Sequence, residues 1–176
     1  MRSIARLFEI GNLSSLTLCT ILVRYTHRNM QTSTVTFTRE RTIRFSDCDP
    51  AGIVFYPQYF VMFNGLVEDW FTEGLNISYQ QMIMTRQIGL PMVHLEASFR
   101  AISKMGDKVL LQLKVEKLGG KSMRLLMQCV SALDGQLRME AKQTLVTTSL
   151  MTHQAIDIPA DFRAAITGLG FADAAQ

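Results

Sequence analysis

The chain has 176 residues, 48% hydrophobic and 19% charged, which fits one folded domain with a short surplus and excludes global disorder. Its net charge of +3 is too small to indicate nucleic-acid binding, although it suits a polyanionic small molecule. The three cysteines match no disulfide or zinc spacing, and no glycine-rich phosphate loop occurs. We therefore expect a reducing, cytoplasmic location, no metal and no cofactor.

The N-terminal segment differs from the rest, because four arginines and a single acid surround a short apolar run over 13–23. That run is too short to span a membrane. An extension ahead of Met30, disordered or non-native, is the interpretation we favour, and a transit peptide or a signal or anchor segment are the alternatives. The predicted organisation is an extension over 1–31, a domain over 32–166 and a C-terminal tail over 167–176.

The first predicted elements are a strand, a link and a long helix. Alternation of apolar and polar residues over 35–45 predicts a half-buried strand. Arg39 and Arg41 interrupt its apolar face, which places the middle of this strand near a sheet edge or a solvated groove. A link rich in turn-forming residues follows over 47–57. Aromatic and aliphatic residues at three- and four-residue spacing then predict a core helix over 59–74.

After a short helix and loop expected over 78–89, the hydrophobic period changes to two and predicts four strands. These strands cover 93–101, 109–116, 123–130 and 137–141. Gly119-Gly120 and Asp134-Gly135 mark hairpin turns between them, and a helical turn is expected over 159–166. A strand, a long helix and four antiparallel strands indicate an α+β fold in which one antiparallel sheet wraps around the buried helix.

The strongest chemical candidate is Asp49, which lies a few residues before the start of the long helix. The backbone amides near Tyr56 begin that helix without partners and carry the positive end of its dipole. An activated carbonyl held there would be polarised, and Asp49 could attack it as a nucleophile or deprotonate a water. The alternative is that Asp49-Pro50 is only a turn dipeptide, and Asp47 could cap or brace the turn. The residues alone do not decide between the two roles of Asp49.

Other candidates have a structural alternative. His94 could act as an acid or base or contact a substrate, or be a structural histidine. Lys121-Ser122 follows a Gly-Gly turn and could grip a phosphate or be a solvated hairpin end. Carboxylates on the predicted helix could replace Asp49, or be exposed charges: Glu68, Asp69 and Glu73. Cys48 has no evident partner base, so a thiol nucleophile is not expected.

The segment over 47–57 closely resembles the signature of the hotdog-fold acyl-CoA thioesterases, of the 4-hydroxybenzoyl-CoA thioesterase type. The similarity continues in shorter segments over 89–91, 97–99, 121–122 and 156–162, and it extends roughly from residue 35 to residue 163. It implies about five antiparallel strands around the long helix. It also implies homodimers that have active sites at the subunit interface and that pair into homotetramers. The net charge and the short apolar run already indicate no nucleic-acid or membrane partner.

Residue by residue, the resemblance implies that Asp49 is the catalytic carboxylate and that the Tyr56 N–H polarises the thioester carbonyl. Lys121, beside Ser122, matches a basic residue near the coenzyme A phosphates, and His94 is a further candidate for substrate contact. There are also departures from the family pattern, since Gly119, Gly120, Thr152 and Gln154 stand where the aryl-CoA enzyme has arginines, and His94 and Glu96 replace smaller polar residues.

The resulting expectation is an acyl-CoA thioesterase that releases a free acid and coenzyme A. An aryl-CoA such as 4-hydroxybenzoyl-CoA is the first candidate substrate, and a short- or medium-chain acyl-CoA is the second. The alternatives are an acyl carrier protein thioesterase and a catalytically silent hotdog protein that binds acyl-CoA.

Overall fold

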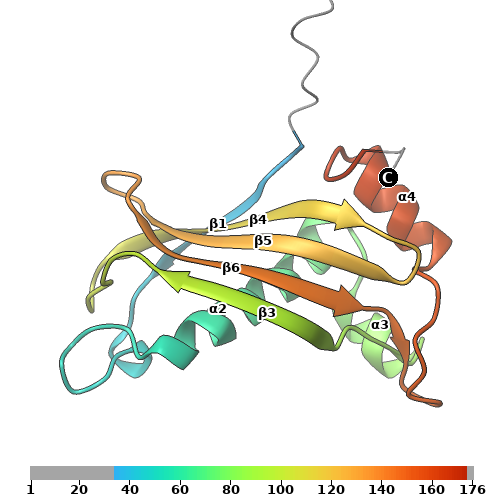
Figure 1. Cartoon of the computed structure of the whole chain (residues 1–176), viewed down its shortest axis with the longest axis horizontal. Helices are drawn as coiled ribbons and strands as arrows, with labels where there is room; N and C mark the ends of the chain where they lie inside the picture. The colour runs from blue at the N-terminus through green and yellow to red at the C-terminus, as the bar shows by residue number, and fades with distance from the viewer. Residues whose placement is uncertain (1–33, 174–176) are drawn as a thin grey trace, which may run out of the picture. The chain divides into compact units, whose positions relative to one another are not determined.

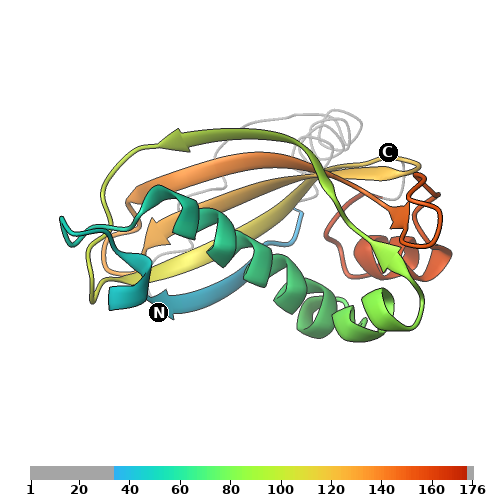
Figure 2. The same ribbon diagram turned by 90° about the horizontal axis from the view of Figure 1, so that it is seen from below.

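A five-stranded antiparallel sheet curves around one long helix, as Figures 1 and 2 show from two directions. The structure is a computed structural model, and it describes residues 34–173. The strands lie in the order β1-β4-β5-β6-β3, and all neighbours are antiparallel. Their bounds are β1 (Phe37–Thr42), β3 (Met92–Phe99), β4 (Lys108–Leu118), β5 (Ser122–Ser131) and β6 (Leu137–Val146). The predicted α+β architecture is confirmed.

The remaining elements are short, apart from α2, which crosses one face of the sheet (Figure 2). They are a 3₁₀ turn (Phe45–Asp47), α2 (Tyr56–Asp69) with a π-helical turn after it (Trp70–Gly74), α3 (Tyr79–Met84), β2 (Ile88–Gly89), β7 (Thr148–Ser149) and α4 (Ala160–Gly168). The long helix begins three residues earlier than predicted, because Pro57 is accepted in its first turn.

The core lies between α2 and the central strands. The inward-facing residues of β4 and β5 are buried: Val109, Leu111, Leu113, Val115, Met123, Leu125, Met127 and Cys129. From α2 and its π-helical continuation, Phe63, Leu66 and Trp70 pack against this face and are themselves buried. The aromatic stripe of the helix is therefore core, as its spacing predicts.

The two edges of the sheet differ from the simple sequence pattern. At one edge, β1 is shorter than predicted, and Phe45 lies in the 3₁₀ turn with 82% of its surface exposed. The strand order confirms that β1 lies at an edge, and Arg39 there forms ion pairs with Asp69 of α2 and Glu73 of the π-helical turn. At the other edge, seven of the eight residues of β3 are exposed, although the strand alternates in sequence.

Of the two predicted terminal segments, only the C-terminal one reaches into the described residues. The extension predicted over 1–31 lies outside the described residues. The tail predicted from residue 167 begins inside α4, which runs to Gly168. Phe171 is buried beyond this helix, with its ring centroid 5.7 Å from that of Trp70. The last described residues therefore add to the core beside the long helix.

Candidate active site

The link between β1 and α2 folds back on itself as a tight loop. Cys48 lies opposite Val54 in an antiparallel bridge. The Asp49 N–H donates to the Ile53 carbonyl at 2.9 Å, and the Gly52 N–H donates to the Asp49 carbonyl at 2.9 Å. Gly52 has a φ of 74°, in the left-handed region that favours glycine. The turn chemistry of the signature segment therefore fixes where Asp49 lies on the loop.

Asp49 and the start of α2 are brought to the same end of the domain. The carboxylate of Asp49 is half-buried, and its Oδ1 accepts the Ala51 N–H at 2.8 Å. Tyr56 is the first residue of α2, and among residues 34–173 its N–H has no hydrogen-bond acceptor. The carboxylate oxygen can attack a carbonyl carbon, and the free N–H at the positive end of this 14-residue helix can polarise the carbonyl oxygen.

A buried carboxylate on the same loop holds it in place. The Oδ1 of Asp47 accepts from the Arg41 guanidinium at 2.9 Å, and its Oδ2 accepts the Arg44 N–H at 2.8 Å. The Asp47 carbonyl accepts the Phe55 N–H at 2.9 Å, directly before Tyr56. Only 3% of the surface of Asp47 is exposed. This confirms that Asp47 braces the turn, and it extends that role to the start of α2.

A pocket of about 310 Å³ opens beside Tyr56, between the start of α2 and the segment that follows β3. Its apolar walls include Tyr56, Phe99 and Ile102, and the ring centroids of Tyr56 and Phe99 lie 6.4 Å apart at 86°. Tyr59 and Ser103 also line it, and their hydroxyl groups are hydrogen-bonded at 3.0 Å. No signal in the sequence links Tyr59 to Ser103, which lies 44 residues further along the chain.

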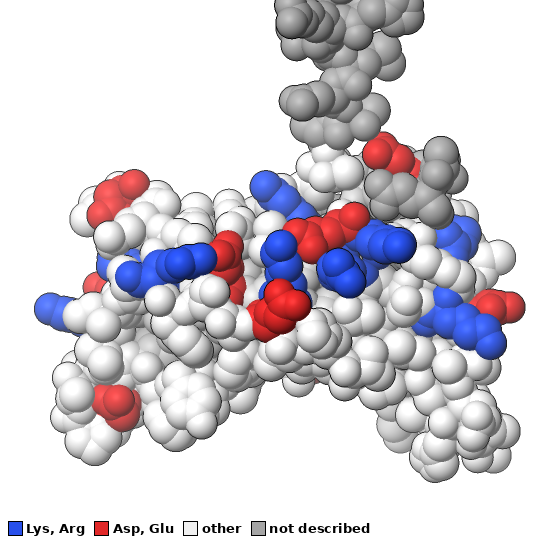
Figure 3. Space-filling model, in the orientation of Figure 1, with Lys and Arg blue, Asp and Glu red and all other residues white. Residues whose placement is uncertain are grey.

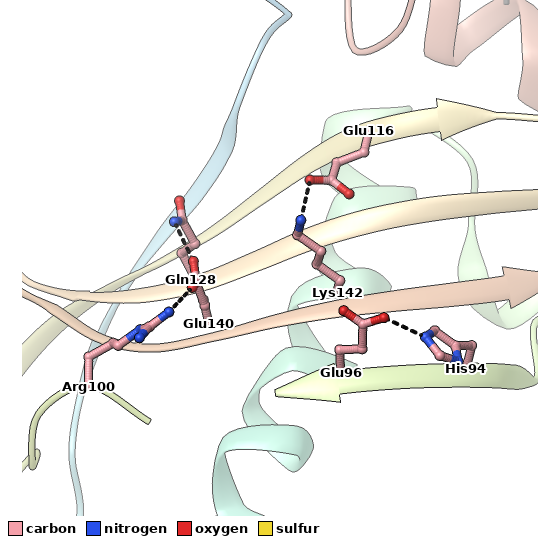
Figure 4. A network of polar contacts seen from close by, with 7 residues as sticks. All are labelled: His94, Glu96, Arg100, Glu116, Gln128, Glu140 and Lys142. Atoms are coloured by element: carbon pink, nitrogen blue, oxygen red, sulfur yellow. Dashed lines mark hydrogen bonds and ion pairs between the residues drawn. The ribbon is translucent and has the colours of Figure 1, made fainter. Parts of the chain in front are cut away.

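His94 is not brought to this end of the domain. It lies on β3 on the face of the sheet opposite α2, and Figure 4 shows it pointing toward Glu96. Its Nε2 lies 2.9 Å from the Glu96 Oε1, and this contact lowers the pKa of Glu96. In Figure 3 cations and anions alternate in a band across the same face. Within one chain His94 is part of this mixed surface, and a contact with substrate stays a prediction.

Lys121 and Ser122 lie at the far end of the sheet from Asp49. Lys121 is exposed in the β4–β5 hairpin, and its Nζ lies 3.4 Å from the Ala155 carbonyl. Ser122 is the first residue of β5. The loop of Asp49 is instead bonded, through Val54 and Ser103, to the segment that leads into β4, and the first residues of β4 pair with the last residues of β5. Ten residues at about 3.3 Å each separate the two ends of β5 by about 30 Å.

The alternative nucleophiles are less suitable. Asp69 and Glu73 are engaged with Arg39, and Glu68 is an exposed residue of α2. The pKa of Cys48 is raised, first by burial and then by the neighbouring carboxylates of Asp47 and Asp49, so its thiol stays protonated near neutral pH.

Two further properties concern the range 34–173. No group of three histidine, cysteine or acidic side chains is arranged there to hold a metal ion. Nor does that range contain a helix long and apolar enough to cross a membrane.

Comparison with known proteins places these features in context. A family model described as the thioesterase-like superfamily matches residues 43–166. The 1,4-dihydroxy-2-naphthoyl-CoA hydrolase of Synechocystis is 28% identical over 134 residues, which are 76% of this chain and 96% of that protein. The 4-hydroxybenzoyl-CoA thioesterase of a Pseudomonas strain is 28% identical over 71% of this chain and 93% of its own length.

Solved structures agree with the sequence comparison. The crystal structure of a 1,4-dihydroxy-2-naphthoyl-CoA thioesterase from Synechocystis superposes with a TM-score of 0.69 and 27% identity. The match covers 75% of this chain and 96% of that one. Sequence and structure therefore point to the same group of proteins.

Proposed function

The chain belongs to the thioesterase-like superfamily, has its hotdog fold and is a thioester hydrolase, and we propose that its substrate is an aryl-CoA. The products would be the free aromatic acid and coenzyme A. A short- or medium-chain acyl-CoA is the second candidate. The relatives named as aryl-CoA hydrolases support the first choice, and so does the aromatic wall that Tyr56 and Phe99 provide beside the free helix end.

One observation carries the proposal: a half-buried carboxylate and an unpaired backbone N–H lie at the same end of the domain, beside an apolar pocket. The carbonyl oxygen of the thioester would accept the Tyr56 N–H, and the helix dipole would stabilise the negative charge that develops on it. Asp49 would act on the carbonyl carbon. Because Ala51 engages only one of its carboxylate oxygens, the other is available for this role.

Asp49 could act by either of two mechanisms, as a nucleophile or as a general base. As a nucleophile, its carboxylate forms an anhydride with the acyl group, the thiolate of coenzyme A leaves, and water then cleaves the anhydride. As a general base, it takes a proton from a water that attacks the carbonyl, and the proton passes to the departing sulfur. If water attacks the aspartyl carbonyl of the anhydride, a single turnover in ¹⁸O-labelled water leaves ¹⁸O in Asp49, which the general-base route cannot do.

The test of the proposed function is release of free thiol from a panel of aryl- and alkyl-CoA thioesters. Asp49→Asn should lower turnover by at least ~10²–10⁴-fold while the protein stays folded and still binds acyl-CoA. Asp134→Asn, in an exposed hairpin turn, is the matched control and should keep wild-type turnover. If Asp49→Asn keeps full turnover, Asp49 is not catalytic, and Glu68→Gln tests the next carboxylate. Binding without any hydrolysis by the wild type would instead indicate a silent acyl-CoA-binding protein.

We also propose that the working unit is a homodimer, paired into a homotetramer, with β3 at the first interface. The outer edge of β3 is unpaired among residues 34–173, and apolar Val93 and Phe99 are 61% and 53% exposed on it. An uncovered edge strand of this kind favours pairing with another strand. In one chain about 30 Å separates Lys121 from the Asp49 end. A Lys121 that contacts the coenzyme A phosphates near Asp49 would therefore come from the partner subunit. Light scattering should find no monomer at micromolar concentration.

A further inference from the structure

The pocket beside Tyr56 has a polar floor under apolar walls. Its floor residues, Tyr59 and Ser103, are 4% and 1% exposed, so bulk water does not solvate their hydroxyl groups. The Phe99 ring lies beside the Tyr59 ring, with 6.0 Å between centroids and a 57° tilt, and Ile102 also lines the pocket. An aromatic ring that enters this space meets aromatic edges first and two hydroxyl groups at the bottom.

The two hydroxyl groups of the floor have one more donor than the hydrogen bond between them uses. Tyr59 and Ser103 bring two hydroxyl protons, and the single bond between them, 3.0 Å long, uses one. Whichever hydroxyl donates, the other proton has no acceptor among residues 34–173. A buried hydroxyl group with an unused proton is unfavourable unless a ligand or water accepts it. Burial raises the pKa of Tyr59, so its phenol keeps its proton at neutral pH.

Backbone contacts hold the floor beside the reacting end. The Val54 N–H donates to the Ser103 carbonyl at 2.9 Å, and Ile53 forms an antiparallel bridge with Lys104. These contacts join the segment after β3 to the loop of Asp49. Tyr59 lies one helical turn after Tyr56 on α2. A group seated on the floor is therefore positioned from the same elements as the carboxylate and the free N–H.

We propose that the Tyr59–Ser103 hydroxyl pair selects aryl groups that carry a hydroxyl substituent over the same rings without one. The inference rests on the proposed function, because it assumes that this pocket receives the acyl group of the thioester. A ring hydroxyl at the floor accepts the unused proton and donates in return, while an unsubstituted ring leaves the pair unsatisfied. Sites built from buried polar groups discriminate strongly against analogues that lack the matching group. The pair would determine specificity and take no part in bond cleavage.

The test compares kcat/KM for benzoyl-CoA with kcat/KM for 3- and 4-hydroxybenzoyl-CoA. Wild-type protein should prefer one hydroxylated substrate by at least about tenfold. Ser103→Ala leaves the Tyr59 proton without an acceptor and should keep part of that preference, whereas removal of both hydroxyl groups should reduce the preference to within about threefold. The double variant Tyr59→Phe/Ser103→Ala removes both hydroxyl groups, so it leaves none unpaired and guards against misfolding. Ser98→Ala, on the opposite face of the sheet, is the matched control.

The outcomes separate the inference from the proposed function. Hydrolysis of all three substrates with an equal preference in wild type and in both pocket variants overturns the inference alone. A wild type that prefers benzoyl-CoA also overturns it. If the wild type hydrolyses no acyl-CoA, the proposed function fails and the inference falls with it. Loss of the preference in the double variant but not in Ser98→Ala supports the assignment.

Discussion

The partly buried ion pair between Arg41 and Asp47, which braces the loop of Asp49, provides the sharpest test of how the site is held. Replacing Arg41 by methionine keeps the apolar stem and removes the guanidinium from the Oδ1 of Asp47. Asp47 is buried and would keep a single donor on its carboxylate, the Arg44 N–H. Breaking a fully buried pair in this way costs about 3–5 kcal/mol. Because the Arg41 side chain is 38% exposed, water can partly replace it, and we expect about 2 kcal/mol.

The measurement is the urea midpoint of unfolding, supported by the thermal midpoint, which should fall by about 6 °C for a domain of this size. Lys108→Met is the matched control, because the Lys108 ammonium lies 3.1 Å from the Glu40 carboxylate with both side chains more than half exposed. Exposed pairs of this kind contribute at most about 1 kcal/mol, so the control should unfold near the wild-type midpoint. Asp47→Asn completes a double-mutant cycle with Arg41→Met.

The same change should affect catalysis. The carbonyl of Asp47 holds the Phe55 N–H, so a loosened loop shifts the start of α2 against Asp49. We expect kcat to fall more than KM rises. The reasoning is refuted if Arg41→Met unfolds at the midpoint of Lys108→Met, or if its effect and that of Asp47→Asn simply add.

Further predictions concern binding, reactivity and pH. Lys121→Ala should raise KM for the best acyl-CoA about tenfold with little change in kcat, because one charge-assisted contact to phosphate is worth roughly 1.5–3 kcal/mol. An equal effect on a pantetheine thioester without the nucleotide would contradict it. Burial raises the pKa of Cys129 to about 12, so iodoacetamide at pH 8 should modify half-buried Cys48 before Cys129, as peptide mass spectrometry can show. The Arg86 guanidinium lowers the pKa of Asp161, so this carboxylate stabilises the fold at neutral pH and loses that contribution as the pH falls below about 4. The difference in thermal midpoint between wild type and Asp161→Asn should therefore shrink from pH 6 to pH 3; a constant difference would contradict the assignment.

The sequence by itself determined most of the local structure. The change of hydrophobic period from 3.6 to two separates the long helix from the strands, because each period follows from the geometry of one element. The signature segment over 47–57 carries its own turn chemistry, with Gly52 in the left-handed region. For that reason local residues alone were enough to predict the loop of Asp49 and its place before α2, and the structure confirms both.

Tertiary structure alone decided which residues meet. Period-two alternation shows which side chains of β3 share a face, but not that β3 lies at the edge of the sheet, where both faces are exposed. The order of the strands likewise puts Lys121 at the opposite end of β5 from Asp49. The hydrogen bond between Tyr59 and Ser103, 44 residues apart, depends on the orientation in which α2 packs against the segment after β3. Such contacts arise from the packing of whole elements, and no short stretch of sequence encodes them.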